Sequence, residues 1–279
     1  MQIKRANEYG FCFGVKRAIK LAEQNRNAIT IGPLIHNQKE IDRLKANFNV
    51  HVETDLNNIK ENSNVIIRTH GIQKNDLERL KQSSINVIDA TCPFVTKPQK
   101  ICEQMSDEGY HIIIFGDKDH PEVKGVASYC TGIYQVVLDK EHINIGILKN
   151  KVALVSQTTK NLSKFLEIAN YLIGICSEVR VFNTICNATF ANQEAVKELA
   201  LDSDVVIVVG GKQSSNTKQL LNISLNYCKD SYCIEDENEL QKEWFVGKKR
   251  CGITAGASTP DWIIDNVENK IREFVKNEF

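Results

Sequence analysis

DATCPFVTK, at residues 89–97, joins a short apolar strand pattern at 86–88 to a helical pattern. Pro93 follows Cys92 directly, where a proline can begin a helix because its missing N–H is not needed there. A thiol at a helix start faces unpaired backbone N–H groups and the positive end of the helix dipole, which favour the thiolate. Because thiolates bind metals, the stretch predicts a strand-to-helix turn that presents a metal ligand.

Two other cysteines have the same setting. Cys12 follows a run at 2–6 and precedes FGVKRAIKLAEQ, in which apolar residues recur at helical spacing. Cys186 follows a strand pattern at 179–182 and precedes NATFANQEAVKELAL, which has the same spacing. The remaining cysteines fall within apolar strand or helix patterns and are predicted to be core thiols. These are Cys102, Cys130, Cys176, Cys228, Cys233 and Cys251.

The overall composition is that of a globular protein. The 279 residues are 42% hydrophobic and 25% charged, and the formal net charge of +0 provides no field to attract nucleic acid or acidic membranes. No apolar run reaches the ~20 residues of a membrane span, and MQIKRANEYGFC lacks the apolar core of a signal peptide. We therefore predict a cytoplasmic protein with no nucleic-acid or membrane partner. The odd count of nine cysteines argues against a disulfide framework.

Short β-rich runs alternate with helical patterns along the chain. Such alternation predicts βαβ units with parallel sheets, and a polar cluster follows each run, where ligands bind in open α/β sheets. The predicted strands lie at 28–34, 65–68, 86–90, 111–116, 151–156, 179–184, 204–210 and 250–255.

The polar clusters repeat three times in the same order. After each cysteine, a first polar strand end follows at 24, 28 and 28 residues and a second at 58, 66 and 72 residues. The first set is His36, His120 and Ser214, and the second is His70, Thr158 and Ser258. The repeat predicts three similar α/β modules with pseudo-threefold symmetry. They span residues 13–92, 93–186 and 187–279, and the N-terminal strand at 1–12 joins the third.

Three convergent thiolates would suit zinc or an iron–sulfur cluster. Structural zinc normally shows C-x2-C pairs, and the sequence has none. Four-iron clusters usually have four cysteine ligands, so three would leave one iron open. That iron could hold a substrate oxygen and deliver electrons.

The repeat also gathers uncharged donors at strand-to-helix turns, which commonly hold a phosphate or diphosphate. They are His36, His70, His120, Thr158, Ser214, Ser215, Asn216 and Ser258. GGKQ at 210–213 is no Walker A loop, since Gln213 stands where serine or threonine is required. Glu122, two residues after His120, is either a proton donor to a leaving hydroxyl or a carboxylate favouring a helix start.

Nine segments resemble those of the LytB (IspH) family, the 4-hydroxy-3-methylbut-2-enyl diphosphate reductases of non-mevalonate isoprenoid synthesis. In chain order they are GFCFGVKRAI, GPLIHN, THGI, DATCPFVTK, GDKDHPEV, SQTT, ICNAT, GGKQSSN and GITAGASTPDW. The resemblance implies a trefoil of three α/β modules around a central iron–sulfur cluster. It also implies reductive dehydroxylation of (E)-4-hydroxy-3-methylbut-2-enyl diphosphate to isopentenyl and dimethylallyl diphosphate.

The same resemblance assigns roles to individual residues. Cys12, Cys92 and Cys186 would hold a [4Fe-4S] cluster whose open iron binds the allylic hydroxyl oxygen. Glu122 would supply protons, with Thr158 orienting the hydroxyl end. The diphosphate would be bound by His36, His70, His120, Ser214, Ser215, Asn216 and Ser258, with His120 also placed among the catalytic groups. The electron donor would be a reduced ferredoxin- or flavodoxin-type protein.

One departure from the family concerns the helix after Cys186, where Asn192 precedes Gln193 although the family often has an arginine at the first of these positions. Two other functions would also use convergent cysteines. A zinc hydrolase acting on a phosphorylated metabolite would be colourless, and a non-catalytic iron–sulfur sensor would not oxidise a reduced viologen dye when given substrate.

Overall fold

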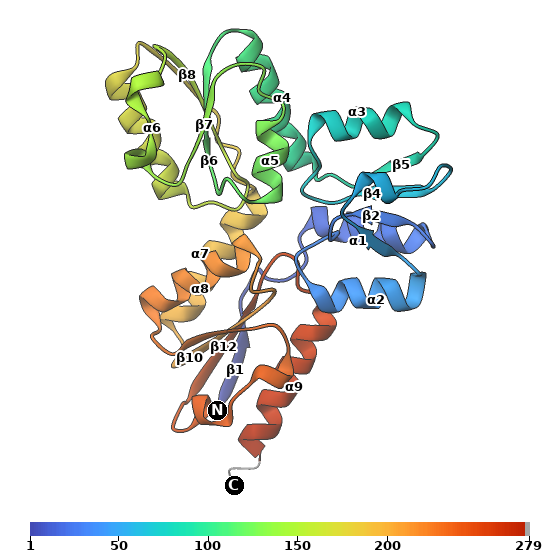
Figure 1. Ribbon diagram of the computed structural model, residues 1–279. Helices are drawn as coiled ribbons and strands as arrows, with labels where there is room; N and C mark the ends of the chain where they lie inside the picture. The colour runs from blue at the N-terminus through green and yellow to red at the C-terminus, as the bar shows by residue number, and fades with distance from the viewer. Residues whose placement is uncertain (277–279) are drawn as a thin grey trace. The chain divides into compact units, whose positions relative to one another are not determined.

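Figure 1 shows the computed structural model of the chain, which describes residues 1–276. The helices are α1 Phe13–Gln24, α2 Gln38–Phe48, α3 Lys74–Gln82, α4 Pro93–Asp107, α5 Pro121–Ala127, α6 Leu162–Ile175, α7 Asn187–Leu201, α8 Ser215–Tyr227 and α9 Asp261–Lys276. The strands are β1 Gln2–Arg5, β2 Ile29–Ile31, β3 His51–Glu53, β4 Asn64–Ile67, β5 Asn86–Asp89, β6 His111–Phe115, β7 Tyr134–Val137, β8 Lys151–Ser156, β9 Glu178–Val181, β10 Val205–Val209, β11 Ser231–Ile234 and β12 Arg250–Ala255. Residues 277–279, at the end of the third predicted module, lie outside the described part.

The strands form three four-stranded sheets with the same internal order. The orders are β3-β2-β4-β5, β7-β6-β8-β9 and β11-β10-β12-β1. All neighbouring strands are parallel. Three parallel α/β modules are therefore confirmed. The repeat found in the sequence corresponds to strand position, because each metal-ligand candidate follows the strand at the same sheet edge.

The N-terminal strand belongs to the third sheet, as predicted. β1 pairs with β12 in parallel, with Gln2 opposite Arg250 and Arg5 opposite Ile253. The opposite edge strand of each sheet, β3, β7 or β11, was missed by the sequence analysis. These strands have three or four residues each, which is too short for a strand pattern to be distinguished in the sequence.

The described chain divides into two compact units. Unit 1 contains residues 1–16, 36–43 and 187–276 with the sheet β11-β10-β12-β1, and unit 2 contains residues 17–35 and 44–186 with the other two sheets. This division does not test the module boundaries at residues 92 and 186, which remain a prediction. None of the helices within residues 1–276 has both the length and the apolarity needed to cross a bilayer.

The sheet that contains β6 illustrates how helices cover both faces of a sheet. Successive β6 residues point to opposite faces, with Ile112 and Ile114 packing in one apolar cluster beside α4 and α5, while Ile113 and Phe115 pack against α6. Figure 1 shows α4 and α5 on one side of this sheet and α6 on the other. A strand buried on both faces reads as a continuous apolar run, which explains why HIIIF was recognisable in the sequence.

The predicted core thiols are only partly confirmed. Cys102, Cys228 and Cys251 are buried, whereas the other three are half-buried. Those three are Cys130, Cys176 and Cys233. Within residues 1–276, all nine cysteines are free thiols.

Candidate functional site

Each of the three candidate metal ligands lies immediately before a helix. Cys92 is the N-cap of α4, with extended backbone angles (φ −64°, ψ 133°) and Pro93 in the first turn. Cys12 precedes α1 and Cys186 precedes α7 in the same way. All three side chains are half-buried, unlike the fully buried Cys102. Helix starts stabilise thiolates, so the three positions suit soft metal ligation.

A matching hydrogen bond fixes each of these cysteines. The backbone N–H of Cys92 donates to Thr69 O at 3.0 Å, and that of Cys186 donates to Thr158 O at 2.9 Å. In unit 1, the N–H of Cys12 donates to Ala257 O at 3.3 Å. In all three modules the acceptor belongs to the loop after the third strand of the sheet order. The cysteine is thereby tied to the loop that carries the second polar group of the repeat.

Two of the predicted histidines lie against each other in unit 2. The ring centres of His70 and His120 are 5.3 Å apart, with the planes nearly perpendicular at 87°. His120 is the N-cap of α5, and its Nδ1 accepts the backbone N–H of Glu122 at 3.2 Å. Because Nδ1 accepts this bond, it is the acceptor nitrogen of the His120 ring.

Glu122 and Thr158 form a closed pair in the same unit. Glu122 Oε1 accepts the backbone N–H of Thr158 at 2.6 Å, and Oε2 accepts its hydroxyl at 2.8 Å. The carboxyl is 1% exposed, so both of its oxygens are held away from water. Because the carbonyl of Thr158 accepts from Cys186, the acid, the hydroxyl and one candidate metal ligand form a continuous chain of contacts.

The environment of Glu122 changes its proton affinity. Burial raises the pKa of the Glu122 carboxyl, and the two Thr158 donors and the charge of Lys160 oppose this rise only in part. Lys160 was missed by the sequence analysis, since a lysine is expected to be exposed, yet it is 9% exposed and burial lowers its pKa. The available signal was its position in the sequence, directly after the polar cluster QTT at the end of a predicted strand.

The remaining predicted residues lie in unit 1. Ser258 donates its hydroxyl to the carbonyl of His36 at 3.2 Å. Gly211 packs on the same carbonyl, because a Cβ at Gly211 would lie 2.3 Å from His36 O. The next residue after His36, Asn37, accepts the Glu40 N–H at 3.1 Å through its side chain at the start of α2. The side chain that caps α2 is therefore that of Asn37, one position after His36, which the predicted repeat placed at this strand end.

Gly211→Ala is expected to destabilise the protein by about 1–3 kcal/mol, because the added methyl must displace the backbone at His36. Urea unfolding of the variant measures this loss. Gly174→Ala in α6 is the control, since a Cβ there meets nothing within 4 Å and the helix should be unaffected or slightly stabilised. Equal unfolding free energies for the two variants would contradict the close approach.

The start of α8 contains the clearest unsatisfied polar group. Ser214 is its N-cap and accepts the Thr217 N–H at 3.3 Å, and Ser215 and Asn216 form the first turn. Asn216 is 3% exposed, and neither its amide nitrogen nor its amide oxygen has a hydrogen-bond partner within residues 1–276. A buried amide with both ends unmatched is costly unless a ligand completes it.

The structure therefore groups the predicted residues within each unit. Unit 2 holds Cys92, Cys186, His70, His120, Glu122 and Thr158. Unit 1 holds Cys12, His36, Ser214, Ser215, Asn216 and Ser258. At the departure from the family, Asn192 and Gln193 are both buried in α7 of unit 1.

Comparison with known proteins identifies relatives over almost the full length. A family model described as LytB protein matches residues 3–272. A 4-hydroxy-3-methylbut-2-enyl diphosphate reductase of Campylobacter lari is 62% identical over 276 residues, which cover 99% of each chain. The enzyme of the same description from Helicobacter pylori is 61% identical, over 97% of this chain and 99% of its own.

Solved structures give the same result. One, described as (E)-4-hydroxy-3-methyl-but-2-enyl diphosphate reductase, the terminal enzyme of the non-mevalonate pathway, matches with a TM-score of 0.72 at 44% identity, covering 98% of this chain and 100% of the other. The E-1-hydroxy-2-methyl-but-2-enyl-4-diphosphate reductase of Plasmodium falciparum matches with a TM-score of 0.88 at 26% identity, covering 96% and 87%.

Proposed function

Because the chain belongs to the LytB family, we propose that Cys12, Cys92 and Cys186 hold a [4Fe-4S] cluster with three cysteine ligands and one open iron. The chain is an iron–sulfur oxidoreductase. It catalyses the reductive dehydroxylation of (E)-4-hydroxy-3-methylbut-2-enyl diphosphate to isopentenyl and dimethylallyl diphosphate, the last step of the non-mevalonate isoprenoid pathway.

The three thiols fit such a cluster by their chemistry. Each lies at a helix start, each is half-buried, and each is fixed by an equivalent backbone hydrogen bond. Soft thiolates are the usual ligands of iron–sulfur clusters. When bound, the cluster supplies the electrons for the reduction.

The diphosphate is proposed to be bound by neutral donors at helix starts. His120 begins α5 and Ser214 begins α8, so backbone N–H groups and helix dipoles accompany their side chains. The unmatched amide of Asn216 gives the most specific support, because its N–H could donate to a phosphate oxygen. His36, His70, Ser215 and Ser258 complete the proposed set.

Glu122 is proposed to be the proton source for the leaving hydroxyl, acting through the Thr158 hydroxyl that it contacts at 2.8 Å. His120 belongs to the same catalytic group, because its ring accepts the N–H of Glu122. Burial favours the protonated carboxyl. In that form Oε2 can donate to the Thr158 hydroxyl oxygen instead of accepting from it, and the hydroxyl passes its own proton on. The overall reaction consumes two electrons and two protons, breaks the allylic C–O bond and releases water.

The equivalent attachment of the three cysteines is the observation that carries this proposal. Its test is anaerobic purification followed by iron and sulfide analysis, a visible spectrum, and oxidation of reduced methyl viologen on addition of the allylic diphosphate. We expect about four irons and four sulfides per chain and substrate-dependent dye oxidation. A colourless zinc protein would overturn the cluster, and a coloured protein that leaves the dye reduced would be a sensor.

We also propose that the chain works in the cytoplasm and receives its electrons from a reduced ferredoxin- or flavodoxin-type protein. The balanced formal charge supports the absence of nucleic-acid and membrane partners.

A further inference from the structure

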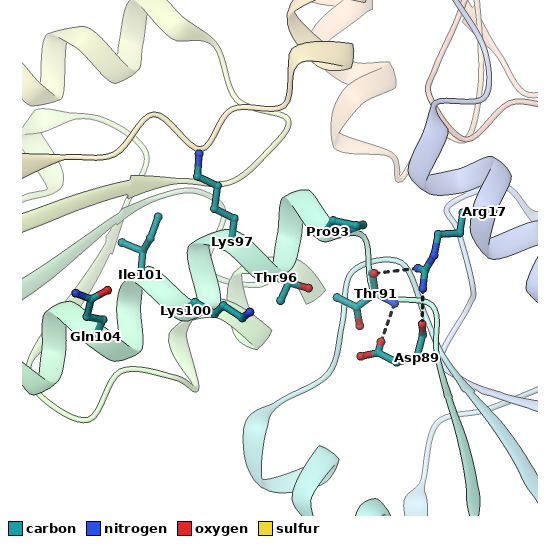
Figure 2. A pocket seen from close by; sticks show the side chains of 9 residues that line it. All are labelled: Arg17, Asp89, Thr91, Pro93, Thr96, Lys97, Lys100, Ile101 and Gln104. Atoms are coloured by element: carbon teal, nitrogen blue, oxygen red, sulfur yellow. Dashed lines mark hydrogen bonds between the residues drawn. The ribbon is translucent and has the colours of Figure 1, made fainter.

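An open groove of about 600 Å³ lies beside the first half of α4 in unit 2. Figure 2 shows Lys97 and Lys100 projecting from α4, and Arg17 of α1 reaching the turn before that helix. The groove also includes Thr91 and Pro93, the two residues that flank Cys92. It lies next to a proposed cluster ligand but does not include the histidines proposed to bind the diphosphate.

Two charged groups of the groove form hydrogen bonds within the protein, whereas its two lysines form no ion pair in the described part of the chain. Arg17 donates to the carbonyls of Thr91 at 3.2 Å and Asp89 at 3.0 Å, and the Asp89 carboxylate accepts the Thr91 N–H at 2.8 Å. These groups hold the turn in place. Lys97 and Lys100 are exposed and form no ion pair within residues 1–276. The groove thus offers two uncommitted positive charges.

Some lysines elsewhere in the described chain have carboxylate partners. Lys74 pairs with Glu103 at 2.7 Å, and Lys39 pairs with Asp236 at the same distance. Lys151 pairs with Glu178 at 3.4 Å, and Lys212 pairs with Glu239 at 2.7 Å. The groove instead gathers Arg17, Lys97 and Lys100 around one carboxylate, Asp89, on a protein whose formal net charge is +0. A local positive patch on a neutral protein favours one orientation of an acidic partner.

An exposed aromatic residue lies on the same helix, outside the lining of the groove. Phe94, in the first turn of α4, is 40% exposed although it follows directly after Pro93. Protein interfaces combine an apolar centre rich in aromatic residues with a polar rim. Transient electron-transfer complexes use small interfaces, so a short patch of this kind is sufficient.

We infer that this groove, with Lys97 and Lys100, is the docking surface for a small acidic protein that carries a low-potential flavin or iron–sulfur group. The inference rests on the proposed function, because it needs Cys92 to be a cluster ligand. Each encounter would oxidise the donor by one electron, which the group held by Cys92 would accept. Two encounters supply the two electrons of one turnover.

The test uses the full-length holoenzyme with both lysines reversed, Lys97→Glu and Lys100→Glu together. The control carries Lys60→Glu and Lys81→Glu, which make the same change in net charge. These lysines are also exposed, and they lie at the amino edge of the β4–β5 pair, where Asn62 N bonds Ser84 O at 2.8 Å. The groove instead begins at Asp89, the carboxyl end of β5.

Two quantities are measured with reduced flavodoxin as the probe: its dissociation constant by calorimetry, and its KM in turnover. We expect both to rise about 10-fold in the groove variant at low salt, but not in the control. The difference should shrink as the Debye length falls from ~30 Å at 0.01 M to ~8 Å at 0.15 M salt. Turnover driven by methyl viologen, and the KM for the diphosphate, should be unchanged.

Equal dissociation constants for the groove variant and the control would overturn the docking surface, whatever the turnover. A raised KM for the diphosphate with the dye as donor would also overturn it, by assigning the groove to the anionic substrate. Failure of the proposed function has a different result, because wild-type protein would then show no dye-driven turnover while the binding measurement still decides the docking surface.

Discussion

Glu122→Gln should lower turnover by about 100-fold or more, while the visible spectrum of the cluster and the fold remain unchanged. Glutamine has the shape of glutamic acid and can keep both contacts with Thr158, with its carbonyl accepting the Thr158 N–H and its amide donating to the hydroxyl. Only the transferable proton is lost. Turnover with reduced methyl viologen measures the effect, and near-normal turnover would remove Glu122 from the mechanism.

The variant Thr158→Val separates proton supply from packing. Valine has nearly the volume of threonine but lacks the hydroxyl that touches the carboxyl at 2.8 Å. If the proton passes through this hydroxyl, the valine variant should also be slow, and restoring a hydroxyl with Thr158→Ser should recover part of the rate. An active valine variant would show that Glu122 reaches its target by another route.

The pH dependence of Glu122→Gln follows from the raised pKa of Glu122. In the folded wild type the carboxyl holds its proton to higher pH than in the unfolded chain. Its contribution to the unfolding free energy is therefore fully present below the unfolded-state pKa and is lost as the pH rises through the folded-state pKa. Urea unfolding at several pH values should show the glutamine variant gaining on the wild type as the pH rises, and an unchanged difference would contradict the raised pKa.

Turnover should fall on the alkaline side of its pH profile for the same reason, because deprotonation removes the donor. The glutamine variant should lack this limb in its residual activity.

The parts of the fold that the sequence analysis found were those with strong local signals. Buried central strands such as HIIIF at β6 are continuous apolar runs, and a cysteine before a helical pattern marks the end of an edge strand. The equivalent strand at the other edge of each sheet has only one neighbour and three or four residues. It is short and is followed by no such marker, so its sequence could not be distinguished from that of a loop.

Among the site residues, too, those with a local sequence signal were predictable and those that depend on distant contacts were not. The positions of Cys92, His120 and Ser214 were predictable, because a helix start depends on neighbours within a few residues. The hydrogen bonds between Thr158 and Glu122 join residues 36 positions apart. The contact between Gly211 and His36 joins residues that are still further apart in the sequence. Such contacts depend on how loops from different strands approach each other, which no local pattern records.

Cys92→Ser and Cys102→Ser should have opposite effects, although both residues belong to the same helix region. Serine is a good N-cap, so Cys92→Ser should keep α4 and the folded state while abolishing the iron–sulfur absorbance and turnover. Cys102 is fully buried in an apolar cluster with Met105 and Ile112. A serine hydroxyl there would cost about 1–3 kcal/mol of stability, measured by urea unfolding.

The contrast between the two variants distinguishes a metal ligand, Cys92, from a core thiol, Cys102. If Cys102→Ser keeps the visible spectrum at a temperature where it is still folded, the loss of colour in Cys92→Ser cannot come from general damage to the helix. A Cys92→Ser protein with intact absorbance would remove that cysteine from the proposed ligand set. Because Cys186 is attached to its loop by the same kind of backbone hydrogen bond, Cys186→Ser should repeat the result of Cys92→Ser.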